Sequence, residues 1–219
     1  MRFEIKIPVE KKFNLYFDHW KDFKKNIYRS YKDRFINSIY YDDENFTTAQ
    51  DNLSGISNRR KYRIRWYDFE FKNFSYEIKI KKNNLGEKVS LKTNQNEVDL
   101  NNLYSLSNSN LNNEKNKFFL NYLDNFNLKP QLKVNYLRSY FTYEDKIRIT
   151  FDQKINYCLT NKFTKEKNKI DDLMSVIEIK FMPENYNLAL KLLNDSNFVP
   201  KRFSKYLRGL YLFGVANYL

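Results

Sequence analysis

Charged and apolar residues alternate along several short stretches of the chain, and most of the charges are positive. The clearest stretch, 59–66, reads Arg-Arg-Lys-Tyr-Arg-Ile-Arg-Trp. Because successive side chains of a β-strand point to opposite faces, Lys61, Arg63 and Arg65 would share one face. The same alternation recurs at 2–7, 76–81, 146–152 and 177–181. The pattern predicts several strands that form one sheet surface, or the lumen of one barrel, built to hold a polyanion.

The length and composition of the chain fit a single folded domain. It has 219 residues, of which 42% are hydrophobic and 18% aromatic, so it can bury a substantial core. With only 4 Gly and 4 Pro, it has little room for flexible linkers. We therefore predict one domain over residues 1–219.

The net charge of +13 favours an anionic partner, such as nucleic acid, phosphorylated metabolites, polyphosphate or an acidic membrane. Two readings of the cationic strand faces stay open. One face of an antiparallel sheet often lies in water, but such faces usually mix their charges. Two like charges at ~4 Å repel by about 4 kcal/mol at an effective dielectric of ~20, and a bound anion would relieve this repulsion.

Several chemistries are excluded or disfavoured by residue type. Cys158 is the single cysteine, so the chain forms no internal disulfide and no zinc cluster, and its apolar neighbours predict an inert thiol. His19, the single histidine, is expected to be a surface or packing residue rather than a catalytic one. Charges interrupt every apolar run, so we expect no signal peptide and no membrane span, and a cytoplasmic protein.

The periodicity of apolar residues places the elements. We expect strands at 1–7, 35–41, 59–67, 75–82, 87–92, 131–143, 145–152 and 175–181, and helices at 11–28, 118–126, 184–195 and 203–219. Pro8 and Pro183 are expected to end strands, and 93–117 to form a polar surface segment. The fold class predicted is α+β, with about eight antiparallel strands.

Nine motifs, in order, carry a resemblance that spans nearly the whole chain. They are Glu-x-Lys at 4–6, Ser-Ile-Tyr-Tyr-Asp at 38–42, Arg-Lys-Tyr-Arg-Ile-Arg-Trp-Tyr at 60–67, Tyr-Glu-Ile-Lys at 76–79, Gly-Glu-Lys at 86–88, Tyr-Leu-Arg-Ser-Tyr-Phe at 136–141, Ile-Arg-Ile-Thr-Phe-Asp at 147–152, Ile-Glu-Ile-Lys at 177–180 and Phe-Ser-Lys-Tyr at 203–206. The series resembles the VTC domain, the polyphosphate polymerase branch of the triphosphate tunnel metalloenzymes. The resemblance implies a closed eight-stranded antiparallel β tunnel, lined by Lys and Arg and covered outside by helices.

The resemblance also implies an activity and a set of site residues. The activity is transfer of the γ-phosphate of ATP to a growing polyphosphate chain. Catalytic contacts are expected from Arg63, Arg65, Lys79, Arg138, Arg148 and Glu178, and further substrate contacts from Lys6, Lys88, Ser204 and Lys205. Glu178 matches the carboxylate that holds a divalent metal, Mn²⁺ or Mg²⁺.

One departure from the wider superfamily bears on the reaction. Hydrolytic tunnel enzymes open with Glu-x-Glu-x-Lys, and this chain has Lys6 in place of the second glutamate. A lysine removes a metal ligand and adds a phosphate contact, which favours the polymerase. A tunnel triphosphatase and a non-catalytic polyanion binder remain the alternatives. No nucleic-acid partner is expected, because a basic recognition helix and an RNP motif are both lacking.

Other polar and aromatic residues are given structural roles. Asp42 and Asp43 follow a strand and suit turn chemistry better than metal binding. Glu4 and Glu77 are expected to be ion-pair partners that set Lys6 and Lys79 in place. Trp66 could stack on an adenine or pack under a helix, and both roles stay open.

Overall fold

The computed structural model describes residues 2–69, 74–82, 85–92, 121, 125–160, 168–194 and 196–215. The polar segment expected at 93–117 lies outside the described residues, as does most of the helix expected at 118–126. In the part of the chain that is described, no helix is both long enough and apolar enough to cross a membrane.

The chain divides into two compact units, each assembled from segments that are distant in sequence. The first comprises residues 1–35, 136–156 and 171–204, and the second residues 36–135, 157–170 and 205–219. Three long strands contribute residues to both units: β2 (Ile27–Asp42), β6 (Lys129–Tyr143) and β7 (Ile147–Leu159).

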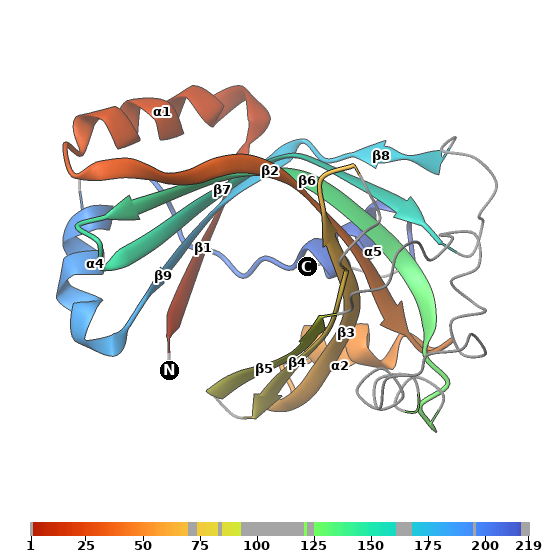
Figure 1. Ribbon diagram of the computed structural model, residues 1–219. Helices are drawn as coiled ribbons and strands as arrows, with labels where there is room; N and C mark the ends of the chain where they lie inside the picture. Colours follow the sequence, from red (N-terminus) through yellow and green to blue (C-terminus); the bar gives the residue numbers. More distant parts are fainter. Residues whose placement is uncertain are drawn as a thin grey trace. The chain divides into compact units, whose positions relative to one another are not determined.

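The other elements each fall in one unit, apart from the short strand β8 (Ile170–Asp171), which pairs with β7 (Figure 1). The first unit holds β1 (Phe3–Glu10), the 3-10 helix η1 (Lys11–Phe13), α1 (Asn14–Phe23), β9 (Met174–Phe181), the 3-10 helix η4 (Pro183–Asn185) and α4 (Tyr186–Leu193). The second unit holds α2 (Thr47–Leu53), β3 (Asn58–Tyr67), β4 (Ser75–Lys82), β5 (Leu85–Lys92) and α5 (Lys205–Leu212).

The strands follow the hydrogen-bonded order β1-β9-β7-β6-β2-β3-β4-β5, and the pairs β1–β9, β7–β9, β2–β3, β3–β4 and β4–β5 are antiparallel. The predicted antiparallel sheet with few helices is therefore confirmed. β1 and β5 stand at the two ends of this order. For the described strands the order is open, and the closed eight-stranded barrel is not confirmed.

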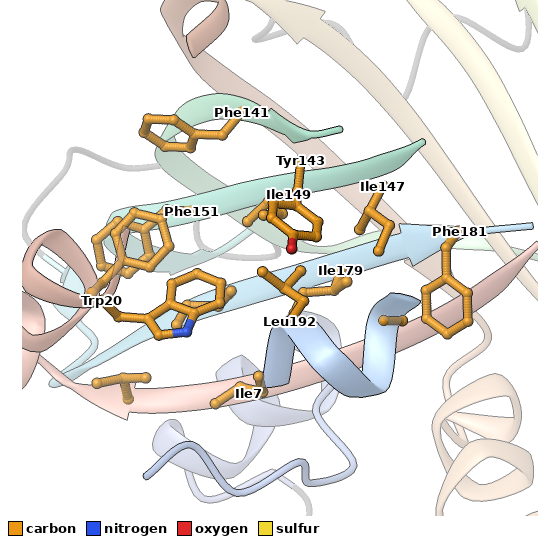
Figure 2. Close-up of a cluster of buried hydrophobic side chains, with 14 residues drawn as sticks. Ile7, Trp20, Phe141, Tyr143, Ile147, Ile149, Phe151, Ile179, Phe181 and Leu192 are labelled. Atoms are coloured by element: carbon orange, nitrogen blue, oxygen red, sulfur yellow. The ribbon is translucent and has the colours of Figure 1, made fainter. Parts of the chain in front are cut away.

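The core of the first unit fills the space between its strands and its helices. Phe17 and Trp20 of α1 pack against β7, where the ring of Phe17 stacks on that of Phe151 with centroids 4.1 Å apart. Leu192 of α4 joins the same cluster beside Ile179 of β9 (Figure 2). The apolar residues of each alternating strand thus face these helices, as predicted.

The second unit has a core of its own on β2, β3 and β4. Tyr62, Ile64 and Trp66, the apolar set of the clearest alternating stretch, are at most 3% exposed and pack against Tyr76 and Ile78 of β4. Trp66 therefore has the packing role, one of the two that the sequence left open. The alternation predicted for 59–67 is confirmed by the burial of every second residue.

Several elements differ from the predictions. The helix α2 and the short strand β8 were not predicted, and β7 runs to Leu159, seven residues past the predicted end. β1 continues past Pro8, which lies opposite Val176 of β9, because proline is tolerated at the edge of a sheet, where its missing N–H faces no partner strand. The helix expected over 11–28 is α1 alone and ends at Phe23, where Lys24 leaves helical geometry. β2 then begins at Ile27, eight residues earlier than predicted.

Candidate functional site: two groups of ion-paired residues

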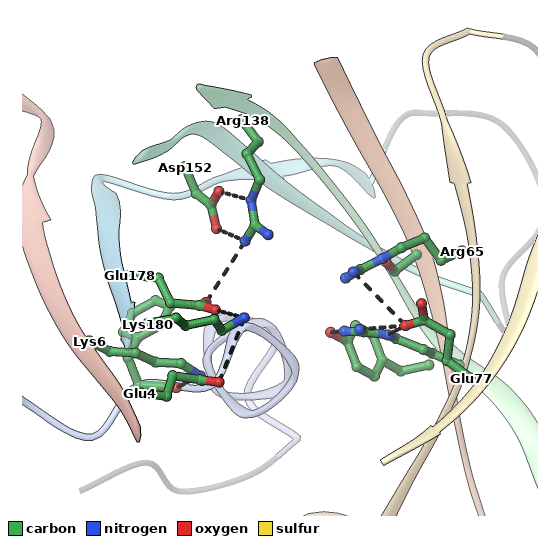
Figure 3. Close-up of polar contacts among 12 residues, drawn as sticks. Glu4, Lys6, Arg65, Glu77, Arg138, Asp152, Glu178 and Lys180 are labelled. Carbon is green, nitrogen blue, oxygen red and sulfur yellow. Dashed lines mark hydrogen bonds and ion pairs between the residues drawn. The ribbon is translucent and has the colours of Figure 1, made fainter. Parts of the chain in front are cut away.

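In the second unit, one carboxylate collects three cations on the polar face of β3 and β4. Nε of Arg63 donates to Oε2 of Glu77 at 2.6 Å, and Nζ of Lys88 lies 2.5 Å from Oε1. Nη1 of Arg65 lies 3.9 Å from Oε2 (Figure 3). We call these residues, with Ser38 and Tyr40, the Glu77 group. Three cations against one carboxylate leave the group with an excess of positive charge.

Strand register explains how these side chains meet. Arg63 lies opposite Glu77 on β4 and opposite Tyr40 on β2, and Arg65 lies opposite Ser38. Arg63 donates to the hydroxyl of Tyr40 at 3.2 Å, and Arg65 donates to that of Ser38 at 3.2 Å. Both guanidinium groups thus contact residues on the strands at either side, β2 and β4.

The charge of Glu77 is stabilised by its neighbours. The residue is 3% exposed, and burial alone would raise the pKa of its carboxyl group. The positive charges of Arg63, Arg65 and Lys88 outweigh burial and lower this pKa from 4.5 to about 2. Glu77 is therefore a carboxylate at any physiological pH, and it organises the cations around it.

Tyr40 links the Glu77 group to α5. Its ring stacks on the ring of Tyr206 with centroids 5.1 Å apart and an interplanar angle of 17°. Burial would raise the pKa of Tyr40, but the charges of Arg63, Arg65 and Lys205 outweigh it, so the pKa lies below its usual value of 10. The hydroxyl of Tyr40 therefore lies in a strongly positive field.

The position of Tyr206 is fixed in turn by a buried aspartate. Its hydroxyl donates to Oδ2 of Asp42 at 2.7 Å, and Asp42 also accepts from the backbone N–H groups of Thr48 and Ala49, at 2.9 and 3.1 Å, and from the hydroxyl of Thr48. Asp42 is thus the last residue of β2, accepts hydrogen bonds from two backbone N–H groups in the first turn of α2, and holds α5 through Tyr206. This agrees with the turn role predicted for it rather than with metal binding.

A row of lysines crosses three strands next to the Glu77 group. Lys79 of β4 lies opposite Lys61 of β3 on one side and opposite Lys88 of β5 on the other. Like charges directly opposite each other destabilise a sheet. A row of one sign is what a site for a polyanion needs, and it is hard to explain as ordinary solvated surface.

In the first unit, a second group of ion pairs is centred on a bidentate contact between a guanidinium group of β6 and a carboxylate of β7. Arg138 donates through Nε to Oδ1 of Asp152 at 2.5 Å and through Nη2 to Oδ2 at 2.7 Å. Asp152 is fully buried. Burial would lower the pKa of Arg138, but Asp152 and Glu178 raise it well above its ordinary value, so the guanidinium stays charged.

Glu178 connects this contact to the edge strand β1. It lies 3.8 Å from Nη2 of Arg138 and forms an ion pair with Lys180, which in turn lies 3.7 Å from Glu4 (Figure 3). Glu4 also pairs with Lys6 at 3.1 Å, as predicted, and Lys6 donates to the carbonyl of Phe203 at 3.1 Å. We call Glu4, Lys6, Arg138, Asp152, Glu178 and Lys180 the Glu178 group. It has three cations and three carboxylates and is balanced in charge.

Glu178 could hold a metal ion only together with other ligands. Among the described residues, no cluster of three or more His, Cys, Asp or Glu side chains is placed to bind one. Mg²⁺, however, is usually held by one or two carboxylates together with substrate phosphates and water. The carboxylate of Glu178 is 7% exposed and paired with Lys180, so it would hold a metal ion only in exchange for that ion pair.

The ten residues expected from the resemblance fall into these two groups or beside them. Lys6, Arg138 and Glu178 belong to the Glu178 group, while Arg148 lies opposite Lys180 in register and Ser204 follows Phe203. The Glu77 group contains Arg63, Arg65 and Lys88, and Lys79 lies in the lysine row. The positive charge of Lys205 contributes to the lowered pKa of Tyr40. Their contacts with phosphate remain predictions.

Sequence reasoning missed four contributors to the two groups. Asp152 and Lys180 were recognised as members of charged strand faces, but not as the partners of Arg138 and Glu178. Ser38 and Tyr40 were recognised only as part of a motif. Their cross-strand positions opposite the arginines were the signal that a register prediction could have used.

Solved structures with the same fold come from the triphosphate tunnel and adenylate cyclase-like proteins. A Hippeastrum protein, HpAC1, described as a candidate adenylyl cyclase with a dominant triphosphatase activity, is 13% identical over 99% of this chain and 98% of its own, with a TM-score of 0.58. A candidate adenylate cyclase of Vibrio parahaemolyticus is 12% identical over 95% and 98%, with a TM-score of 0.52. The PH1819 protein of Pyrococcus horikoshii is 18% identical over 97% and 99%, with a TM-score of 0.51.

A family model described as the VTC domain matches residues 4–213. The chain belongs to the VTC domain family, and the resemblance found in its motifs is confirmed. None of the curated proteins with which the sequence was compared matches it significantly.

Proposed function

We propose that this protein is a polyphosphate polymerase that transfers the γ-phosphate of ATP to the end of a growing polyphosphate chain in a closed tunnel. The observation that supports it most directly is the charge of the Glu77 group. Its three cations are fixed by a single carboxylate, Glu77, that cannot neutralise them. A polyphosphate chain carries about one negative charge per phosphate and would supply the missing counter-charge.

The chemistry requires positioning rather than a protein nucleophile. Phosphoryl transfer passes through a loose transition state in which charge spreads over the phosphoryl oxygens, and oriented cations stabilise it. Arg63 and Arg65 suit paired contacts with phosphate oxygens, whereas Lys79 and Lys88 act as mobile point charges. A terminal phosphate oxygen of the growing chain would be the attacking group. Mn²⁺ or Mg²⁺ on Glu178 would neutralise charge on the donor phosphates.

Lys6 supports chain growth over hydrolysis. It lies directly opposite Glu178 in the β1–β9 register, and Glu4 and the carbonyl of Phe203 hold its ammonium group. A carboxylate at this position would stand beside Glu178 and could share a metal or orient a water molecule. A lysine adds a positive charge for phosphate in its place.

The polymerase is tested by incubating the protein with ATP and Mn²⁺ and staining for polyphosphate on a gel. We expect long anionic chains from the wild type, and a loss of about 100-fold or more for Arg63→Ala and Glu178→Gln. Lys191→Ala is the matched control, because it removes one positive charge from the exposed surface of α4 and should leave chain growth unchanged. Release of free phosphate without chain growth would contradict the proposal.

A triphosphatase is the second candidate, and the activity described for HpAC1 favours it. It predicts phosphate release from tripolyphosphate that depends on Glu4 as a metal ligand. Replacing Lys6 by glutamate separates the two. If the wild type is a polymerase, Lys6→Glu should lower chain growth and raise hydrolysis of tripolyphosphate. A wild type that already hydrolyses tripolyphosphate and makes no chains supports the triphosphatase.

A further inference from the structure

The first half of β2 is exposed to solvent on both faces. Residues 28–34 are all exposed, with Tyr28 at 45% and Tyr31 at 54%, whereas the second half, from Ile36 to Asp42, is buried throughout. A strand of an antiparallel sheet usually buries at least one face. Within the chain, Tyr31 meets the ring of Tyr140 edge-on with centroids 5.9 Å apart, and Arg34 lies over the same ring. These contacts leave all seven residues exposed, so the segment keeps surface that a partner could cover.

One edge of this segment is also available for pairing. The neighbours of β2 are β6 and β3, and the ladder with β3 begins only at Ile36, which pairs with Tyr67, the last residue of β3. Among the described residues, no strand continues that side of the sheet along 28–33. An edge of this kind offers its backbone N–H and C=O groups to a strand from another chain.

The sequence of this edge, Tyr-Arg-Ser-Tyr-Lys-Asp-Arg at 28–34, is complementary to itself when two copies run antiparallel. With Tyr31 opposite its own copy, each Arg29 lies opposite an Asp33 and each Tyr28 opposite an Arg34. Cross-strand pairs of opposite charge and of aromatic rings stabilise a sheet. Within one chain, Nη1 of Arg29 already lies 2.5 Å from Oδ1 of Asp33, so the two side chains suit each other as partners.

The neighbouring registers are unfavourable, which makes this pairing specific. A shift by one residue places Arg29 opposite Lys32 in one direction and opposite Arg34 in the other. Both shifts set like charges against each other, which destabilises the pair. The charges therefore favour one of these three registers.

We propose that this edge binds a second copy of the chain and forms a symmetric dimer, in which the two β2 edges pair antiparallel about Tyr31. The interface is isologous, since the same residues contribute from both copies. The proposal does not depend on the proposed enzymatic activity, because its readout is association.

A disulfide between the two copies tests the register. In a Cys158→Ser background, Tyr31→Cys places two thiols opposite each other, with Cα atoms about 4.5–5.5 Å apart, which lies within the range for a disulfide. Tyr28→Cys is the matched control, because position 28 and its copy would lie six residues apart along the pair, about 20 Å. Under mild oxidation we expect covalent dimer from Tyr31→Cys and none from Tyr28→Cys. Equal yields from both, or none from Tyr31→Cys, overturn the register.

A charge exchange tests the association itself by sedimentation over a series of concentrations. We expect the wild type to approach twice its mass of 26.8 kDa as the concentration rises. Arg29→Asp or Asp33→Arg alone should weaken the dimer by roughly tenfold or more, and the two together should restore it. Unchanged thermal unfolding confirms that each variant folds. A wild type that stays monomeric throughout, or a double variant without recovery, overturns the proposal and leaves the edge protected by its charges or reserved for a different chain.

Discussion

Glu77 and Arg63 face each other across β4 and β3, and the guanidinium Nε donates to a carboxylate that is 3% exposed. Arg63, Arg65 and Lys88 share this one carboxylate, which holds the three cations close together. This relationship ties the stability of the second unit to the chemistry proposed for it. The charge of Glu77 that organises the cations also stabilises the fold, and protonation would remove that charge.

The ion pairs of Glu77 predict sensitivity to acid. The pKa of its carboxyl group is about 2 in the folded chain, against an ordinary value of 4.5, so the unfolded chain takes up the proton first as the pH falls. The stabilisation is complete above about pH 4.5 and is lost as the pH falls through about 2, and it amounts to about 3 kcal/mol. Urea unfolding of wild type and Glu77→Gln should therefore show a difference in free energy of unfolding that narrows across this window. A difference independent of pH would contradict it.

The contact between Arg138 and Asp152 predicts strong coupling. Asp152 is fully buried, so removing either partner leaves an uncompensated charge, and Arg138→Met or Asp152→Leu should each cost about 3–5 kcal/mol in free energy of unfolding. Replacing both removes both charges, so Arg138→Met with Asp152→Leu should cost much less than the sum. A double-mutant cycle from denaturant unfolding measures this coupling. Additive losses would show that the two side chains act independently.

The stacked tyrosines predict separable effects on binding and on stability. Tyr40→Phe keeps the ring on Tyr206 but removes the hydroxyl that accepts from Arg63. The affinity for tripolyphosphate, measured by calorimetry, should fall about 3- to 10-fold with little change in stability, because one orienting contact of Arg63 is lost.

Tyr206→Phe is the matched comparison for this effect. It removes the hydrogen bond to Asp42 and should cost about 1–3 kcal/mol in free energy of unfolding while leaving affinity nearly intact. The result that would contradict the assignment is equal loss of affinity in both variants.

Gly209 of α5 predicts a steric limit in the second unit. A Cβ at this position would lie 2.5 Å from Cδ2 of Leu132 and 2.6 Å from Cδ1 of Tyr157, closer than atoms pack. Gly209→Ala should therefore destabilise the chain by about 1–3 kcal/mol, although alanine is the better helix former. Thermal unfolding measures the change. A stabilised Gly209→Ala variant would contradict the packing.

The sequence predicted a strand well where one face of that strand is apolar and packs against a core. The alternation at 59–67 and 175–181 predicted β3 and β9, because each of these strands has one apolar face against a core. Residues 28–34 gave no such signal, since both faces of that part of β2 are exposed, and the adjacent helix was extended into it. Local pattern therefore located strands with one apolar face and missed the exposed half of β2, but it also missed the end of β7, where Ile155 and Tyr157 are buried.

The candidate site was predicted as a list of residues but not as a set of contacts. The sequence placed Arg138 and Glu178 among the functional residues, yet it did not reveal that Asp152 of β7 is the partner of Arg138 of β6. Such pairs depend on the register between β6 and β7. These strands are joined by a turn in which Glu144 and Asp145 both have a positive φ. Register is set by the whole sheet, so a local pattern cannot supply it.

The hydrogen bonds of Asp42 restrict how this sequence can diverge. Its two oxygens accept from Thr48, Ala49 and Tyr206, and an asparagine would offer one acceptor oxygen and an extra donor in the same buried space. Related sequences can therefore tolerate arginine in place of an exposed lysine, whereas almost no substitution is tolerated at position 42. In a set of related sequences, the least variable acidic position would then be one that touches no substrate.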